Sequence, residues 1–136
     1  KPEETVEMAA RAMVEHHVGC LPVVDDDFKP VGIITESDIF KVFLEITGVK
    51  NGGVQFGVDM PNEPGTLRPL LADIRNQGAS IRSVLTMVDA HDESKRKVYI
   101  RLRATDRSLE NKVVEDIQAK YQLMYWARDN VHPLTS

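Results

Sequence analysis

The chain has 136 residues, a net charge of −4 at pH 7 and a single cysteine, Cys20. Apolar residues make up 42% of it and charged residues 28%, a mixture typical of globular domains. The acidic balance argues against a nucleic-acid-binding protein, and no apolar run approaches the roughly 20 residues needed to span a bilayer. Because one cysteine cannot form an internal disulfide and no signal segment opens the chain, we expect a cytoplasmic protein. The length allows one ordinary domain or two small ones.

The first part of the chain predicts the order α-β-β-α. Residues 3–17 carry apolar side chains at the spacing of a one-sided helix. "CLPVVD" and "PVGIIT" read as short strands joined by an acidic turn, and the second strand leads directly into a helix with apolar residues on more than one side. The apolar surroundings of Cys20 predict a buried thiol.

The pattern changes after a glycine-rich segment at residues 49–53, which we interpret as a linker. Alternating apolar residues from Val54 predict a strand, and a helical stripe from Leu67 ends at Gly78 in the C′ position. Two strands follow in residues 79–89 and 97–105, with Lys95-Arg96-Lys97 expected to be a solvated hairpin tip. A helix capped by Ser108 and a strand at 122–128 complete β-α-β-β-α-β, the ferredoxin-like arrangement.

The predicted fold class is therefore α+β, in two domains. We expect a first domain at residues 1–48, the linker at 49–53, a second domain at 54–130 and a C-terminal tail at 131–136. In the second domain, the long and lightly charged strand "ASIRSVLTMVD" is expected to lie at a sheet edge. Such an edge favours pairing with a second copy, so we expect a homodimer joined near residues 66–88.

A candidate anion or nucleoside site lies where the strand "VGIIT" meets the following helix. Free amides and the helix dipole favour an anion at this point. The hydroxyls of Thr35 and Ser37 can donate to phosphate or ribose oxygens, and Asp38 can accept from both hydroxyls of a ribose. The alternative is that Thr35 is only an N-cap, with Glu36 and Asp38 favouring the dipole.

Both parts of the chain resemble known families. "LPVVD" followed by "GIITESDI" is similar to a cystathionine-β-synthase (CBS) domain, and "VDMPNEPGTLRPLLADIRNQGASIRSVL" resembles an ACT domain, a regulatory module of amino-acid metabolism. The two in this order resemble the acetoin-utilisation protein B family, which has two CBS domains and a C-terminal ACT domain. The resemblance implies that only one CBS domain of the usual pair is present here, and that it lacks the leading segment that usually precedes its first helix. The chain is then a fragment of a longer protein, or a second chain supplies the partner.

The CBS resemblance implies an adenine nucleotide such as AMP, ATP or S-adenosylmethionine, bound between paired CBS domains. Thr35, Ser37 and Asp38 match the nucleotide-binding positions, and the backbone near Gly19 and Cys20 would face the base or the phosphates.

A second candidate site is the loop before the second-domain helix. Gly65 lets backbone approach a ligand closely, free amides there can hold a carboxylate, and Asn62 offers a donor and an acceptor. The ACT resemblance implies an amino-acid or small-carboxylate site made by Asn62, Glu63, Gly65 and Thr66 with Ser80 on the next strand. The alternative is an ACT fold kept only for dimerisation.

No catalytic constellation is visible, so we expect a protein that is not an enzyme, that needs no cofactor and that holds no metal. Cys20 lacks an obvious partner base, and no Ser/His/Asp or Cys/His set has the spacing of a nucleophile and its base. The leading hypothesis is a ligand-sensing regulatory protein. A pure assembly module without ligand, and a regulatory fragment of a larger enzyme, stay open as alternatives.

Overall fold

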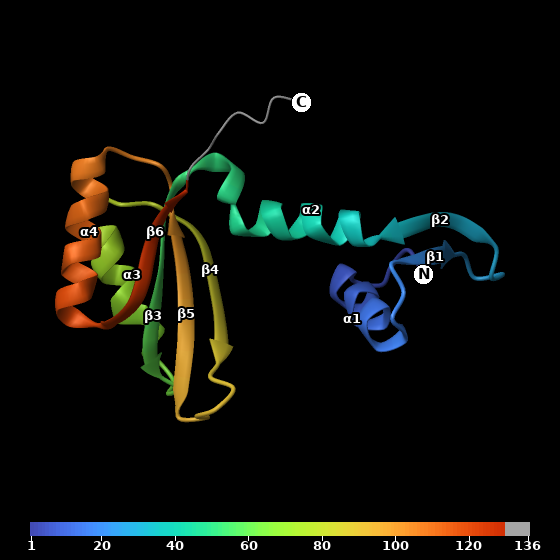
Figure 1. Ribbon diagram of the computed structural model, residues 1–136, viewed down its shortest axis with the longest axis horizontal. Helices are drawn as coiled ribbons and strands as arrows, with labels where there is room; N and C mark the ends of the chain where they lie inside the picture. The colour runs from blue at the N-terminus through green and yellow to red at the C-terminus, as the bar shows by residue number, and fades with distance from the viewer. Residues whose placement is uncertain (130–136) are drawn as a thin grey trace. The chain divides into compact units, whose positions relative to one another are not determined.

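A computed structural model describes residues 1–129, and the expected tail at 131–136 lies outside the described residues. The chain divides into two compact units, the first spanning Lys1–Glu45 and the second beginning at Ile46. The first unit contains α1 (Val6–His16), β1 (Cys20–Val24), β2 (Pro30–Thr35) and most of α2 (Glu36–Thr47), which is the predicted order (Figure 1).

Both ends of α1 are closed by local hydrogen bonds. The Thr5 hydroxyl accepts from the Met8 amide at 3.3 Å, the usual N-cap contact. At the other end His17 adopts a left-handed conformation, and its amide points back at the carbonyls of Met13 and Val14. These two caps explain why α1 is shorter than the predicted range of residues 3–17.

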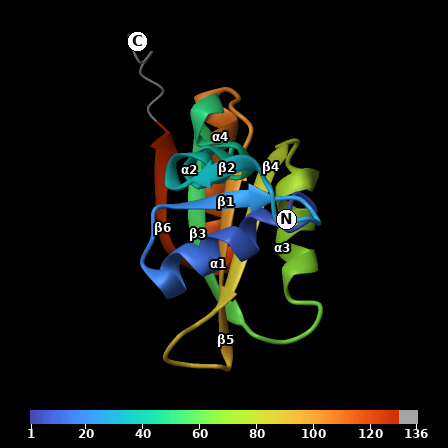
Figure 2. The ribbon, with the colours of Figure 1, turned by 90° about the vertical axis from the view of Figure 1, so that its right-hand side faces the viewer.

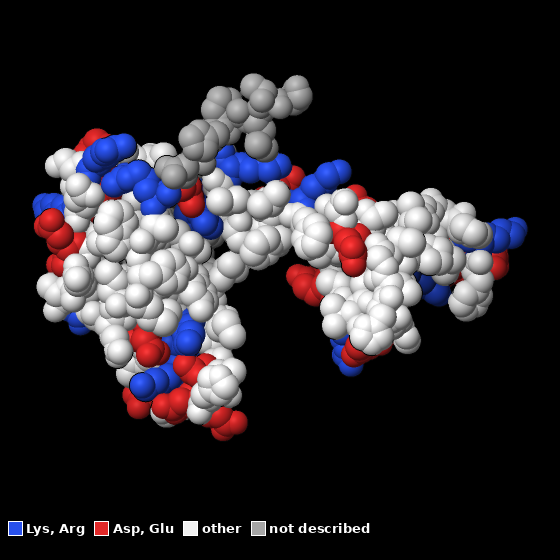
Figure 3. All heavy atoms as spheres, in the orientation of Figure 1, with Lys and Arg blue, Asp and Glu red and all other residues white. Residues whose placement is uncertain are grey.

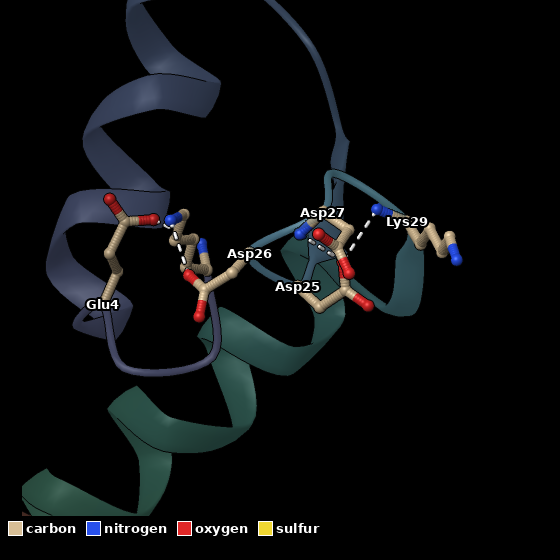
Figure 4. A network of polar contacts seen from close by, with 6 residues as sticks. Glu4, Asp25, Asp26, Asp27 and Lys29 are labelled. Carbon is tan, nitrogen blue, oxygen red and sulfur yellow. Dashed lines mark hydrogen bonds and ion pairs between the residues drawn. The ribbon is translucent and has the colours of Figure 1, made fainter.

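The turn between β1 and β2 is organised by one carboxylate. Asp25 accepts from the amides of Asp27 and Lys29, both at 2.9 Å (Figure 4). The backbone of Asp25 also pairs with that of Lys29, and Phe28 sits at a φ of 59°. An aspartate that bonds to amides two and four residues ahead replaces the missing backbone partners of a tight turn.

The first unit buries few side chains. Met13 is its one fully buried apolar residue, whereas Val31, Ile33, Phe40 and Phe43 are all more than half exposed. Cys20 is also exposed, so the prediction of a buried thiol is wrong. The two-stranded sheet has too few neighbours in this chain to cover both of its faces.

The second unit is the predicted βαββαβ fold. It contains β3 (Gly53–Pro61), α3 (Leu67–Asn76), β4 (Ile81–Val88), β5 (Lys95–Leu102), α4 (Arg107–Lys120) and β6 (Gln122–Asp129). The strands pair antiparallel in the order β4-β5-β3-β6 (Figure 2). A short 3-10 helix, Val49–Asn51, lies within the segment expected to be a linker.

The core of the second unit lies between the sheet and its two helices, which cover the same face (Figure 1). Its fully buried members come from β3, β5, α3 and α4: Val54, Phe56, Val58, Leu70, Ile74, Val98, Ile100, Leu102, Val113 and Ile117. The period of two in the strands and the i, i+3, i+4 spacing in the helices predict this face correctly.

Two local predictions in this unit are wrong. Asp106, not Ser108, caps α4, because its carboxylate accepts from the Leu109 amide at 2.8 Å. Lys95, Arg96 and Lys97 are not a hairpin tip but the first residues of β5. Aspartate and serine are both favoured N-cap residues, so the residue type alone does not choose between Asp106 and Ser108. For β5, pairing with β3 and β4 continues through Lys95, Arg96 and Lys97 and makes them part of the strand.

The sheet has two free edges, and β4 is one of them, as predicted. Leu85 and Met87 on β4 and Met124 and Trp126 on β6 are each more than one third exposed. In Figure 3 mostly uncharged atoms cover the region of β6 and the neighbouring strands. Both edges therefore offer apolar side chains beside unpaired backbone.

Candidate functional site

The structure brings together the five residues predicted to bind a nucleotide. Cys20 is the register partner of Thr35 across the β1–β2 pair, and the Gly19 carbonyl accepts from the Glu36 amide at 3.0 Å. Ser37 and Asp38 lie in the first turn of α2. One end of the hairpin and one helix start therefore form a single cluster.

Thr35 and Asp38 close the start of α2 by reciprocal hydrogen bonds. The amide and the hydroxyl of Thr35 both donate to Asp38 Oδ2 at 2.9 Å, and the Asp38 amide donates to Thr35 Oγ1 at 3.3 Å. This is a capping box with aspartate in the acidic position. The Thr35 amide, and then its hydroxyl, hold the pKa of Asp38 below its ordinary value. The N-cap alternative thus describes part of what these residues do.

The capping box leaves one side of the carboxylate open. Asp38 Oδ1 accepts no hydrogen bond from residues 1–129, although Oδ2 accepts two. An ionised carboxylate has about four acceptor positions, so Oδ1 can still take hydroxyl donors from a ligand.

An open apolar groove meets this cluster at Gly19 and Glu36, and of the five predicted residues only Gly19 lines it. Met13 and Val14 of α1 line one side, and Ile39 and Phe40 of α2 line the other. Phe40 is 62% exposed and presents a ring at the surface. Such a surface can pack against the flat face of a purine, while the helix start beside it holds polar groups.

Glu36 limits what the groove can accept. A Cβ built on Gly19 would lie 3.4 Å from the Glu36 carboxyl carbon, so this acidic group stands beside the backbone expected to face phosphates. The groove lining includes no lysine or arginine. The arrangement suits the uncharged nucleoside part of a ligand better than a polyphosphate.

In the second unit, the side chain of Asn62 is already engaged. Its Nδ2 donates to the Glu93 carbonyl at 3.0 Å, and its Oδ1 accepts from Arg96 Nε at 3.2 Å. Its backbone amide also donates to the Ser94 carbonyl at 2.8 Å. Asn62 therefore ties the loop to the β4–β5 connection, and a ligand would compete for these bonds.

The rest of the loop leaves its helix start open. The hydroxyl of Thr66 donates to the carbonyls of Pro61 and Glu63 and does not cap α3. Gly65 has a φ of 84°, and a Cβ there would meet no atom within 4 Å. Arg96, absent from the predicted site, lines the same pocket as residues 62–67. The amides of the first turn and this guanidinium are the groups able to hold a carboxylate.

Ser80 does not join this loop. It lines a separate pocket with Arg75 and Arg103, at the other end of α3. A helix of ten residues is about 15 Å long. Within one chain, the predicted effector residues therefore lie at two separate sites, the Asn62 loop and the pocket that contains Ser80.

Comparison with known proteins identifies the first unit. The CBS domain family model matches residues 1–45, the range of the first compact unit. The first unit is a CBS domain. The match covers a third of the chain.

Two relatives match this chain over segments about as long as the CBS domain. An uncharacterized protein of Acidianus ambivalens is 51% identical over 41 residues, which is 30% of this chain and 25% of that protein. An uncharacterized protein of Methanocaldococcus jannaschii is 39% identical over 44 residues, 32% of this chain and 26% of the relative. The chain spans about a quarter of the length of these relatives.

Two solved structures resemble the fold weakly. A formyltetrahydrofolate deformylase of Pseudomonas putida has a TM-score of 0.39 at 12% identity, covering 57% of this chain and 28% of that one. A prephenate dehydratase of Streptococcus mutans has a TM-score of 0.42 at 12% identity, covering 91% and 81%. Similarity at this level says nothing about the function of the second unit.

Neither the CBS domain nor the second unit shows a metal centre. Among residues 1–129, no three His, Cys, Asp or Glu side chains are grouped so that they could hold an ion. No helix in the same range is long and apolar enough to cross a membrane.

Proposed function

We propose that the chain is a cytoplasmic, non-enzymatic regulatory protein in which the CBS domain binds an adenine nucleoside or nucleotide. The observation that carries this proposal is the free Asp38 Oδ1 in the first turn of α2, the helix whose Glu36, Ile39 and Phe40 line the apolar groove. The carboxylate would accept from the ribose hydroxyls, and the base would lie against Phe40 and Ile39. Glu36 favours adenosine, AMP or S-adenosylmethionine over ATP, because added phosphates add repulsion.

The second unit is proposed to be an ACT-type domain that dimerises the protein. Its βαββαβ fold and the free apolar edge at β4 support this role. The order of the two units supports a place beside the acetoin-utilisation protein B family. The exposed Phe40 and Phe43 of the CBS domain support pairing with another CBS domain, from a longer chain or from a second copy.

A second candidate function is assembly without an effector at the Asn62 loop. The bonds of Asn62 to Glu93 and Arg96 favour it, because they already satisfy the side chain proposed to recognise an amino acid. In that case residues 62–66 set the geometry of the loop, and the second unit serves only to bring copies together.

Calorimetric titration of the full chain with adenosine, AMP, ATP and S-adenosylmethionine tests the nucleotide proposal. Asp38→Asn keeps an acceptor for the cap but removes the charge, and we expect it to weaken binding by about tenfold or more. Asp27→Asn, an acid in the β1–β2 turn, is the matched control and should bind as the parent does. Equal affinity for all three proteins would remove Asp38 from the site, and no binding of any ligand would leave assembly as the better function.

A further inference from the structure

Two arginines from different elements of the second unit line one pocket. Arg75 comes from the last turn of α3 and Arg103 follows the end of β5, and the pocket also contains Ser80 from the intervening turn. Figure 2 shows α3 running beside β4, where this turn connects them. The Arg103 amide donates to the Ser80 carbonyl at 2.8 Å, which fixes the backbone of one arginine against the turn.

The charge of these arginines is not balanced within the described residues. Neither guanidinium forms an ion pair or a hydrogen bond with any side chain of residues 1–129. The pocket lining holds no aspartate and no glutamate. Arg101, two residues before Arg103, differs in this respect, because Asp129 pairs with it.

The remaining surface of the pocket is apolar. Leu71, Ile81 and Val84 line it and pack against the core of the second unit. Their positions are set by the fold, so the pocket combines apolar side chains held against the core with two exposed arginines. A ligand that fits both parts has anionic groups joined by a short carbon chain.

We propose that this pocket binds a small dicarboxylate that lacks an ammonium group. Two guanidiniums balance two carboxylates, and each offers the paired donors that match a carboxylate. An α-amino acid is disfavoured, because its ammonium would lie near two positive charges with no acid in the pocket to pair with it. The inference goes beyond the proposed function, which gives the second unit a dimerising role, and assigns this unit a ligand class at a place other than the Asn62 loop.

The test compares succinate with aspartate, which is the same dicarboxylate carrying an ammonium. The full chain is titrated with each at constant ionic strength, and binding is followed by thermal unfolding and calorimetry. We expect succinate to raise the unfolding midpoint and aspartate to bind about tenfold or more weakly. Arg75→Gln and Arg103→Gln should each weaken succinate binding by about tenfold or more.

Arg68→Gln is the matched control, since Arg68 lies on α3, is exposed and does not line the pocket. It should bind succinate as the parent does, and circular dichroism confirms that all three variants fold. Equal effects of succinate on all variants would overturn the proposal in favour of a general salt effect. No effect on the parent would overturn it too, as would tighter binding of aspartate or of inorganic phosphate. An adenosine titration in the same samples separates these outcomes from failure of the nucleotide proposal.

Discussion

Arg101 and Asp129 form a buried bidentate ion pair across the central strand of the second unit. Arg101 Nε lies 2.8 Å from Asp129 Oδ2, and Nη2 lies 3.3 Å from Oδ1. Their side chains are 6% and 10% exposed. Since β3 lies between β5 and β6, the arginine reaches over β3 to its partner. Its Nη1 also donates to the carbonyl of Thr47, another residue of the second unit, at 2.8 Å.

Removing one member of this pair should cost more than removing both. Arg101→Met leaves a buried carboxylate without its cation, and we expect the free energy of unfolding to fall by about 3–5 kcal/mol. The double variant Arg101→Met/Asp129→Leu should recover a large part of that loss. Urea denaturation of the full chain measures all three proteins. If the single and double variants lose equal free energy of unfolding, the unpaired charge of Asp129 is not the cause of the loss.

The capping box of α2 predicts that the stability of the protein falls at acidic pH. The folded pKa of Asp38 is lowered, so its contribution to stability is present above the ordinary carboxyl value of about 4 and is lost as pH falls through the folded pKa. Thr35→Ala removes the hydroxyl that donates to Asp38 Oδ2 and accepts from the Asp38 amide, but it keeps the amide of residue 35 as a donor. The variant should therefore reduce the loss of stability in acid in part and not abolish it. Thermal unfolding from neutral to acidic pH checks it, with Asp27→Asn as a control that should keep the parent profile.

The environment of Tyr121 predicts that the stability of the protein falls at alkaline pH. Burial, followed by the hydrogen bond to Asp73 at 2.7 Å, raises the pKa of Tyr121 to about 12. Its contribution to stability is therefore complete below the unfolded value of about 10 and is lost as pH rises toward 12. Tyr121→Phe should cost about 0.5–1.5 kcal/mol at neutral pH and flatten the decline above pH 10. An unchanged alkaline decline in the variant would assign it to another group.

The backbone at Gly53, the first residue of β3, predicts that any larger residue there destabilises the fold. Its φ is 116°, and a Cβ there would lie 2.3 Å from the Leu102 carbonyl oxygen, a backbone atom that cannot move aside easily. Gly53→Ala should lower the free energy of unfolding by at least about 2 kcal/mol. Gly65→Ala provides the comparison, because its φ is 84° but its Cβ would meet no atom. It should lose only the conformational part, about 1–2 kcal/mol.

The free edge at β4 predicts the mode of dimerisation. Leu85 and Met87 are 36% and 51% exposed, so lysine at either position should leave the fold intact. If copies join through β4, Leu85→Lys/Met87→Lys should give a monomeric mass in light scattering at micromolar concentration. Met124→Lys on the opposite edge, β6, should stay dimeric. The reverse result would place the contact at β6, and a monomeric parent would contradict the dimer.

The sequence by itself determined the order of the elements and a few of their local ends. Periods of two and 3.6 predict the strands and helices, and Gly78 follows α3 with a φ of 90°, as its C′ position requires. Thr35 and Asp38 are three residues apart, so their capping box depends on the local path of the chain alone. Hydrogen bonds of this kind are set by neighbours in sequence, which is why Thr35 and Asp38 meet at the start of α2, whereas Gly19 and Cys20 reach them through the pairing of β1 with β2.

Only the tertiary structure decided which distant groups meet. Asn62 is engaged by Glu93 and Arg96, more than 30 residues away, because β3 pairs with β5 at that end. Arg101 alternates with apolar residues as a surface side chain would, yet it is buried, because Asp129 arrives on the far side of β3. Arg75 and Arg103 share a pocket for the same kind of reason. Strand order and register bring these side chains together, and neither is written in the spacing of residues along one element.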